Sequence, residues 1–287
     1  MLTRLATPVA ARLIAYRLYH PPRRRHHRSP EQFGLDARTT TVTTDDGVDL
    51  HVWVVPGTGD RAAVVGHGIG LTKSGSLAHA RLLADLGFGV VMFDHRNHGL
   101  SGRDPSSRGL SDRFTRDVEA CVNAVPTFFP GVVSTVVWGF SFSSFPSFYA
   151  LGRPHCEVSA VLCDSGPADT LEPLFHGFAD AGALPLRGPY RRGPARTTLV
   201  EAVARTATAM LDARWPPPDE GRFRSTPALF LSGRDDSIAR TEHVRALSDR
   251  YPAARTEVVA GGHLDGIKVD PEGYGARVRT FLEAALP

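Results

Sequence analysis

Short, uniformly apolar runs alternate with amphipathic segments along most of this chain. Strands have no polar face when helices cover a sheet on both sides, and these runs fit that pattern. They span residues 62–65, 89–93, 132–138, 158–163, 228–231 and 256–259. The amphipathic segments have helical spacing and span residues 76–87, 111–125, 142–151, 241–250 and 272–285. Alternating strands and helices predict a mostly parallel sheet with right-handed crossovers.

Two further strands precede this alternation. The runs TTTVTT and VDLHVWVV lie on either side of the turn signal DDG, so they predict an antiparallel hairpin. With this hairpin included, the predicted fold class is α/β, with an eight-stranded, mostly parallel sheet and helices on both faces.

The alternation stops between residues 166 and 224. This proline-rich stretch has no strand-like run, lies after the sixth strand and is too long for a simple connection. We therefore expect a small helical cap, inserted over one edge of the sheet. The predicted organisation is an N-terminal helix and basic linker at 1–37, an α/β core at 38–165 and 225–287, and the cap at 166–224.

The first 37 residues have a helical apolar pattern followed by the basic run RRRHHR. The apolar positions are Leu2, Leu5, Val9, Leu13 and Tyr16. Pro8 and Arg12 interrupt the segment, which argues against a secretory signal, and no run approaches the roughly 20 apolar residues that span a bilayer. We expect a helix that packs on the domain beside a solvated basic linker. The alternative is a helix that lies in a membrane interface.

Composition narrows the class of protein. The 287 residues are 42% hydrophobic and 22% charged, which suits one large or two small domains with a substantial buried core. The formal net charge of +3 is too small to indicate a nucleic-acid partner. Cys121, Cys156 and Cys163 are odd in number and lack CxxC spacing, so we expect buried free thiols in a reducing cytoplasm rather than disulfides or a zinc site.

The stretch VVWGFSFSSF, residues 136–145, places a serine just after a predicted buried strand. Gly139 and Ser143 flank Ser141 at the two positions that must be small where strand and helix nearly touch in a nucleophile elbow. Serine also caps helices very often. This stretch alone therefore leaves both a helix cap and a nucleophile open.

A glycine-rich loop follows the strand at 62–65, at the edge where parallel α/β sheets bind ligands. The glycines of HGIG allow a sharp turn that aims amide groups into a cavity. The amides of Ile69 and Phe142 could then bind a developing oxyanion. A glycine turn with a structural histidine is the alternative, and we assign His67 no proton-transfer role.

The loops after the last two strands supply a carboxylate and an imidazole. Asp236 is placed to orient a histidine, and its neighbour Asp235 is the alternative acid. His263 follows two glycines in a loop that could return over the sheet. An imidazole held by a carboxylate and facing Ser141 is the general base that a serine hydroxyl needs at pH 7. An exposed turn and an incidental histidine are the plainer interpretations of these loops.

Taken together, these loops make the chain resemble the α/β-hydrolase fold superfamily over roughly residues 38–285. The order of the serine, aspartate and histidine, and the place of the cap, match that superfamily. The segment DHRNHGLSG at 94–102 is similar to its DxRGxGxS segment, with Asn97 where glycine is commoner. Asparagine tolerates the left-handed backbone better than most residues. The chain departs from the pattern at Phe140, where histidine is frequent, and at Ser143, where glycine is usual.

The resemblance implies a serine hydrolase that cleaves a carboxylic ester or thioester through an acyl-enzyme, with no cofactor and no metal. Ser141 would attack the carbonyl, His263 would remove the serine proton, and Asp236 would hold the imidazole tautomer. The amides of Ile69 and Phe142 would bind the oxyanion. A serine nucleophile argues against the epoxide hydrolases and dehalogenases of this fold, whose nucleophile is aspartate.

The expected partner is a small acyl substrate, with no nucleic acid and no stable membrane insertion. Gly68 and Phe140 are expected to border its pocket. Residues 187–224 carry eight arginines against four acidic residues, which favours a solvated cap surface; attraction of an anionic or carrier-linked substrate is the alternative. The cap could also face the pocket with apolar residues, which are Leu171, Leu174, Phe175 and Phe178. For Phe145 and Phe148 we favour ordinary core packing.

Two other functions would use the same site. A lyase of this fold would use Ser141 and His263 to eliminate a group without net hydrolysis, because a fold does not determine a reaction. A binding module would use the pocket without chemistry, and it predicts that a fluorophosphonate would not label Ser141.

Overall fold

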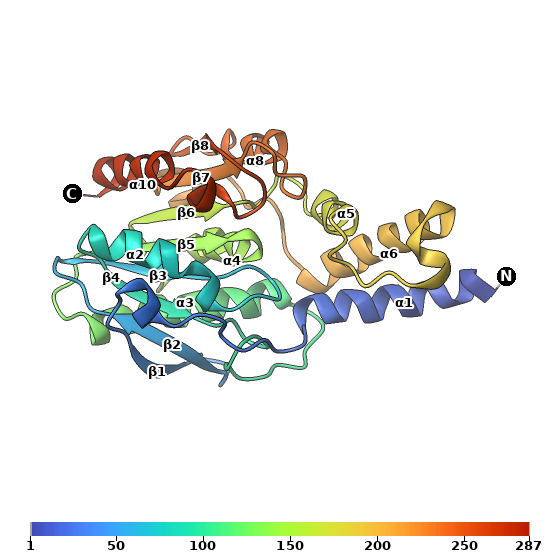
Figure 1. Cartoon of the computed structure of the whole chain (residues 1–287), viewed down its shortest axis with the longest axis horizontal. Coiled ribbons are helices and arrows are strands. Elements are labelled where there is room, and N and C mark those ends of the chain that lie inside the picture. The colour runs from blue at the N-terminus through green and yellow to red at the C-terminus, as the bar shows by residue number, and fades with distance from the viewer. Residues whose placement is uncertain (1, 287) are drawn as a thin grey trace.

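The computed structural model describes residues 2–286, with side chains from residue 7 onward. Within them, one sheet of eight strands forms the centre of the molecule, in the order β1-β2-β4-β3-β5-β6-β7-β8 (Figure 1). β1 and β2 form the predicted hairpin, β2 pairs antiparallel with β4, and the other neighbours are parallel. The strands are β1 Arg38–Thr43, β2 Asp49–Val55, β3 Arg61–Val65, β4 Gly89–Phe93, β5 Ser134–Phe140, β6 Ala160–Asp164, β7 Ala228–Gly233 and β8 Ala254–Val259.

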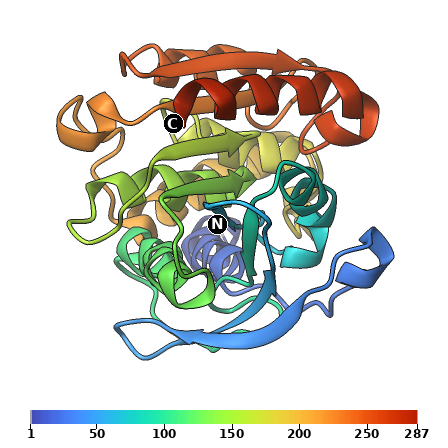
Figure 2. The same ribbon diagram turned by 90° about the vertical axis from the view of Figure 1, so that its left-hand side faces the viewer.

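Helices cover both faces of this sheet (Figure 2). The core on one face includes side chains of α3, α4 and α8, and the core on the other includes side chains of α2 and α10. The helices are α1 Leu2–Tyr19, α2 Leu77–Asp85, α3 Leu110–Phe128, α4 Ser144–Tyr149, α5 Glu172–Asp180, α6 Gly193–Leu211, α7 Gly221–Ser225, α8 Thr241–Ser248, α9 Gly266–Val269 and α10 Pro271–Ala285. The predicted fold class is confirmed.

The central strands are buried along almost their whole length, as their uniformly apolar sequences predicted. β4 and β6 have no exposed residue, and β5 is buried except at Thr135. The prediction ended β5 at residue 138, which is wrong by two residues. Gly139 and Phe140 still pair with Cys163 and Asp164 of β6, so Ser141 is the first residue after the strand.

The segment between β6 and β7 contains α5, α6 and α7, and α1 packs along α6 (Figure 1). In that view, the α1–α6 pair extends to one side of the sheet, with the N-terminal end of α1 farthest from it. The two helices approach through small side chains, because Ala11 and Ala15 of α1 are fully buried, as are Ala204 and Ala207 of α6.

The predicted contact face of α1 is wrong. The buried positions of this helix are Thr7, Ala11, Ala15 and Tyr19, whereas Val9 and Leu13 are 63% and 60% exposed. The apolar pattern misled the prediction because alanine on one face of a helix allows a closer approach to a neighbour than leucine or valine on another. Leu2 and Leu5 lie outside the described side chains.

The basic linker is only partly solvated. Arg24, Arg25 and Arg28 are exposed, as predicted. His26 is not: its ring lies 4.6 Å from that of Trp53, and its Nε2 atom donates to Asp94 at 2.8 Å. This contact attaches the linker to the end of β4.

Candidate active site

Ser141 lies in a sharp turn between β5 and α4. It follows the last strand residue directly and starts a short 3₁₀ turn, Ser141–Ser143, which leads into the helix. Its φ of +50° is in the left-handed region, which a residue with a side chain adopts only under strain. A strained serine between strand and helix is the geometry of a nucleophile elbow.

The residues two before and two after Ser141, Gly139 and Ser143, are small for different physical reasons. A Cβ atom at Gly139 would lie 2.6 Å from the Cα atom of Ser144, so only glycine fits there. Ser143 has a side chain where the superfamily pattern has glycine, and its hydroxyl is hydrogen-bonded to Nε2 of His95 at 2.9 Å. Space for that hydroxyl exists because residue 66 is glycine; a Cβ atom there would collide with Ser143.

His263 connects Ser141 to a carboxylate. The Ser141 hydroxyl lies 2.8 Å from Nε2 of His263, and Nδ1 of the same ring lies 2.8 Å from Oδ2 of Asp236. Because a carboxylate only accepts, Nδ1 carries the proton and Nε2 is left to accept from the serine. The structure therefore brings the three predicted residues together in the order that general-base activation requires.

The carboxylate next to His263 belongs to Asp236 and not to Asp235. Asp236 is buried, and its second oxygen accepts from the amides of Ile238 and Ala239, each at 2.8 Å. These bonds fix the carboxylate in one orientation. Asp235 is exposed to solvent.

The loop after β3 lies beside Ser141. A Cβ atom on Gly68 would approach Cβ of Ser141 to 3.4 Å, and the amide of Gly70 donates to His98 at 3.0 Å. Ile69 lies between these two glycines and packs against the same apolar cluster as Phe142. The two predicted oxyanion residues are thus on the backbone segments on either side of the serine.

His67 is a structural residue of this loop. Its Nε2 accepts from the amide of His95 at 3.0 Å, so Nδ1 carries the proton and donates to the carbonyl of Gly68 at 2.8 Å. Burial holds the pKa of His67 well below its ordinary value. A neutral imidazole with both nitrogens occupied holds the loop in place, and this agrees with the expectation that His67 transfers no proton.

A second buried carboxylate supports the His263 loop, and the sequence analysis missed it. Asp164 accepts from the hydroxyls of Ser165, at 2.8 Å, and of Tyr274. The Ser165 hydroxyl in turn accepts from the amide of Leu264 at 2.9 Å. Burial raises the pKa of Asp164 to about 6, although both hydroxyls oppose the shift. Asp-Ser directly after a buried parallel strand was the signal that could have identified this pair.

A small apolar cavity of about 50 Å³ lies between Ser141 and the segment inserted after β6. The four apolar residues predicted to face the pocket from that segment all line it. The lining is Tyr19, Ser141, Phe142, Phe145, Ser165, Gly166, Pro167, Leu171, Leu174, Phe175, Phe178, Leu211, Ile238 and His263. Sequence reasoning missed Tyr19, which comes from α1. Phe148 is fully buried in the core, as predicted, whereas Phe145, for which core packing was also expected, is buried but lines the cavity.

Gly68 and Phe140 border a different cavity, on another side of His263. Its volume is about 340 Å³, and its lining also includes Leu71, Leu264 and Lys268. Phe140 is buried, with its ring 4.3 Å from that of His79. Both cavities reach His263, but only the apolar one is lined by Ser141.

The arginines of the inserted segment lie away from these cavities; none of those described lines either one. Arg196 pairs with Asp180 at 2.7 Å and Arg224 with Asp219 at 2.6 Å. Arg222 instead donates to the carbonyls of Arg153 and Cys156. Three arginines of the inserted segment are thus already paired or hydrogen-bonded within the protein.

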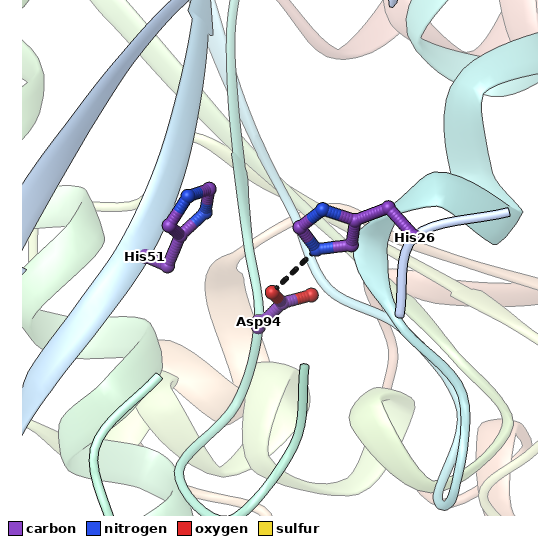
Figure 3. A group of neighbouring side chains, drawn as sticks. All are labelled: His26, His51 and Asp94. Carbon is purple, nitrogen blue, oxygen red and sulfur yellow. Dashed lines mark hydrogen bonds and ion pairs between the residues drawn. The ribbon is translucent and has the colours of Figure 1, made fainter. Parts of the chain in front are cut away.

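One group of side chains in the described residues has the spacing of a metal site: His26, His51 and Asp94 (Figure 3). Lys73 already places a positive charge among them. Its Nζ atom lies 2.6 Å from His51, 2.8 Å from Asp94 and 3.1 Å from His26. Burial lowers the pKa of Lys73 to about 8, although Asp94 opposes the shift. Asp94 and Nδ1 of His51 accept from this ammonium group, whereas Nε2 of His26 donates to the same carboxylate, so Asp94 joins the linker to Lys73.

No protein-family model matches the chain. It is 26% identical over 302 residues to the uncharacterized membrane protein YNL320W of Saccharomyces cerevisiae, covering 98% of this chain and 94% of that protein. It is 28% identical over 180 residues to human Protein ABHD12B, covering 61% of this chain and 44% of that protein. No helix among residues 2–286 is both long and apolar enough to cross a bilayer.

Among solved structures, the chain is similar to the Pyrococcus furiosus esterase Pf2001. The TM-score is 0.74 at 21% sequence identity, over 94% of this chain and 98% of that one. At this level of identity, the likeness is one of architecture.

Proposed function

We propose that this chain, which has the α/β-hydrolase fold, is a serine hydrolase that cleaves a carboxylic ester or thioester through an acyl-enzyme. The observation that carries the proposal is the pair of 2.8 Å contacts joining Ser141, His263 and Asp236. The strained backbone at Ser141 supports it as well, since a helix cap has no need of a positive φ.

In the proposed reaction, the Ser141 oxygen attacks the substrate carbonyl while its proton passes to Nε2 of His263. The Nδ1 proton stays on the ring, and Asp236 stabilises the imidazolium that forms. The amides of Ile69 and Phe142 are proposed to bind the oxyanion, a contribution of about 3 to 4 kcal/mol for one such donor. His263 then returns its proton to the leaving group, and water releases the acyl group by the same steps.

The cavity beside Ser141 limits the acyl group. Its volume of about 50 Å³ is far below the roughly 300 Å³ of common ligand pockets. We therefore propose a short acyl group as the preferred substrate in this conformation, with longer chains requiring the inserted segment to move. The solved structure named an esterase supports an ester as the substrate class.

Activity-based labelling tests the proposal. A fluorophosphonate should label the wild type and fail to label Ser141→Ala. Ser147→Ala is a matched control, because Ser147 is a buried serine on α4 whose hydroxyl has no partner, and it should label normally. p-Nitrophenyl esters of increasing chain length should then be hydrolysed with a preference for short chains. Labelling that persists in Ser141→Ala would contradict the proposed nucleophile.

Labelled water separates hydrolysis from elimination. A hydrolase incorporates the water oxygen into the acid product, whereas a lyase releases an alkene with no label.

We also propose a cytoplasmic location, which the three buried free cysteines, Cys121, Cys156 and Cys163, support.

A further inference from the structure

The N-terminal helix exposes an apolar stripe that no part of the described chain covers. Val9 and Leu13 lie one turn apart on α1, and both are more than half exposed. The opposite face of the helix, at Ala11 and Ala15, is the one that packs on the protein. Val9 and Leu13 therefore take no part in packing α1 against the rest of the described chain.

Positive charge surrounds the stripe. Arg12 and Arg17 are exposed on the same side of α1, at positions adjacent to or in line with Val9 and Leu13. The first thirty residues contain seven arginines and no Asp or Glu, whereas the rest of the chain has 26 basic and 30 acidic residues. The excess charge of the protein is thus concentrated near its N-terminus, with four of these arginines, within residues 23–28, in the linker that follows α1.

We propose that this face of α1, defined by Val9, Arg12, Leu13 and Arg17, docks the protein reversibly on an anionic lipid bilayer. Exposed aliphatic side chains between arginines are the pattern of helices that lie in a membrane interface. The aliphatic groups enter the acyl boundary, and the arginines contact lipid phosphates. The α1–α6 pair extends to one side of the molecule (Figure 1), and all four residues of this face are exposed.

The docking face and the proposed active site share structural elements. Tyr19, at the end of α1, and Leu211, at the end of α6, both line the apolar cavity beside Ser141. A docked molecule would therefore hold a helix that lines this cavity against the lipid. This last point rests on the proposed function, whereas the docking itself does not.

Vesicle co-sedimentation of the full chain tests the proposal. Wild-type protein should bind vesicles that contain phosphatidylglycerol, bind pure phosphatidylcholine vesicles more weakly, and lose affinity as salt is added. Val9→Ser combined with Leu13→Ser should weaken binding by about tenfold or more, since both apolar insertions are lost. Arg12→Gln combined with Arg17→Gln should weaken it by about tenfold and flatten the salt dependence.

Matched controls separate docking from general surface stickiness. Val133 and Val269 are also large apolar residues that are exposed, at 68% and 59%, but they lie outside α1. Val133→Ser combined with Val269→Ser should bind vesicles like the wild type, as should Arg245→Gln on α8. All these variants should hydrolyse a soluble short-chain ester normally. Ser141→Ala should keep its vesicle binding, so failure of the chemistry and failure of docking can be told apart.

Three results would overturn the proposal. One is wild-type binding that does not depend on anionic lipid. Another is an equal loss of binding in the control pair and in the α1 pair. The third is a concentration-dependent dimer, with no vesicle binding, that Val9→Ser and Leu13→Ser abolish, because a second copy of the chain would then be the occupant of the stripe.

Discussion

Asp236 and Asp235 are adjacent acids with opposite surroundings, so they form a natural pair of variants. Asp236→Asn would keep the shape of the side chain but leave His263 free to take the wrong tautomer. We expect kcat to fall by about 10⁴-fold with little change in KM. Asp235→Asn should leave kcat within twofold, because that side chain is exposed. Ester hydrolysis by the two purified variants checks this, and equal losses would reopen the choice of acid.

Asp164 makes the stability of the protein depend on pH. Its pKa is raised to about 6 in the folded state, against about 3.9 in an unfolded chain. Between these values the unfolded chain has released a proton that the folded protein keeps, so the contribution of Asp164 to stability falls as the pH rises from about 4 to about 6. The loss amounts to about 3 kcal/mol for a shift of two units.

Comparison with Asp164→Asn isolates this effect from other titrating groups. Urea unfolding at several pH values should measure this. Between pH 4 and pH 7, the free energy of unfolding of the variant should rise by about 2 to 3 kcal/mol relative to that of the wild type. Asp235→Asn should show no such trend. A difference between Asp164→Asn and wild type that is constant with pH would mean that the carboxylate is already ionised at pH 4.

Single residues of the candidate site were predictable where the signal was local. Ser141, Asp236 and His263 each follow a strand of the sheet, and glycines mark their turns. Tyr19 was not predictable in this way, because its place in the cavity depends on how α1 packs against α6. The difference between Asp235 and Asp236 was also not predictable, since only the folded turn shows which of the two side chains is buried.

At the scale of elements, α5 supplies apolar side chains to the cavity beside Ser141. Phe178 lines the cavity, with its ring 6.4 Å from that of His263. Phe178→Ala should raise kcat/KM for longer-chain p-nitrophenyl esters, relative to the acetate, by about tenfold or more. Phe128 is also a partly buried phenylalanine, but it lies on α3, outside the cavity. Phe128→Ala should therefore not change the chain-length preference. An unchanged preference in Phe178→Ala would place the acyl group elsewhere.

Elements were predicted well where a sheet determines the pattern and poorly where two helices meet. The apolar runs of β3 to β7 identified the strands because burial on both faces excludes polar residues. The contact face of α1 was predicted wrongly because its partner α6 is distant in the sequence and offers alanines. A helix with apolar residues on one side and small residues on another does not reveal which side a neighbour will choose.

At the scale of the whole molecule, Lys73 fastens the N-terminal linker to the sheet. It is fully buried and pairs with Asp94, which also binds His26. Lys73→Met would leave a buried carboxylate without its cation, and we expect a loss of about 3 to 5 kcal/mol in the free energy of unfolding. Lys268→Met breaks an exposed pair with Asp265 and should change stability little. Urea unfolding compares the two, and equal losses would contradict this role of Lys73.

Topology was the most predictable feature of the whole molecule. Eight strands, a hairpin and an insertion after the sixth strand all followed from the alternation of patterns, whereas the exchange of β3 and β4 in the sheet was not predicted. The attachment of the linker did not follow, because basic residues usually face water and only the fold shows a buried partner for His26. Long-range polar contacts of this kind leave no periodic trace in a sequence.

The close contact between Gly66 and Ser143 also constrains how this sequence can drift over evolutionary time. An alanine at position 66 is blocked while position 143 carries a hydroxyl, because its methyl group would occupy the place of that side chain. Glycine at 143 would lift the block but would leave Nε2 of His95 without its hydroxyl partner. A lineage can therefore change these positions in only one order, the second before the first, and must tolerate an unsatisfied imidazole on the way.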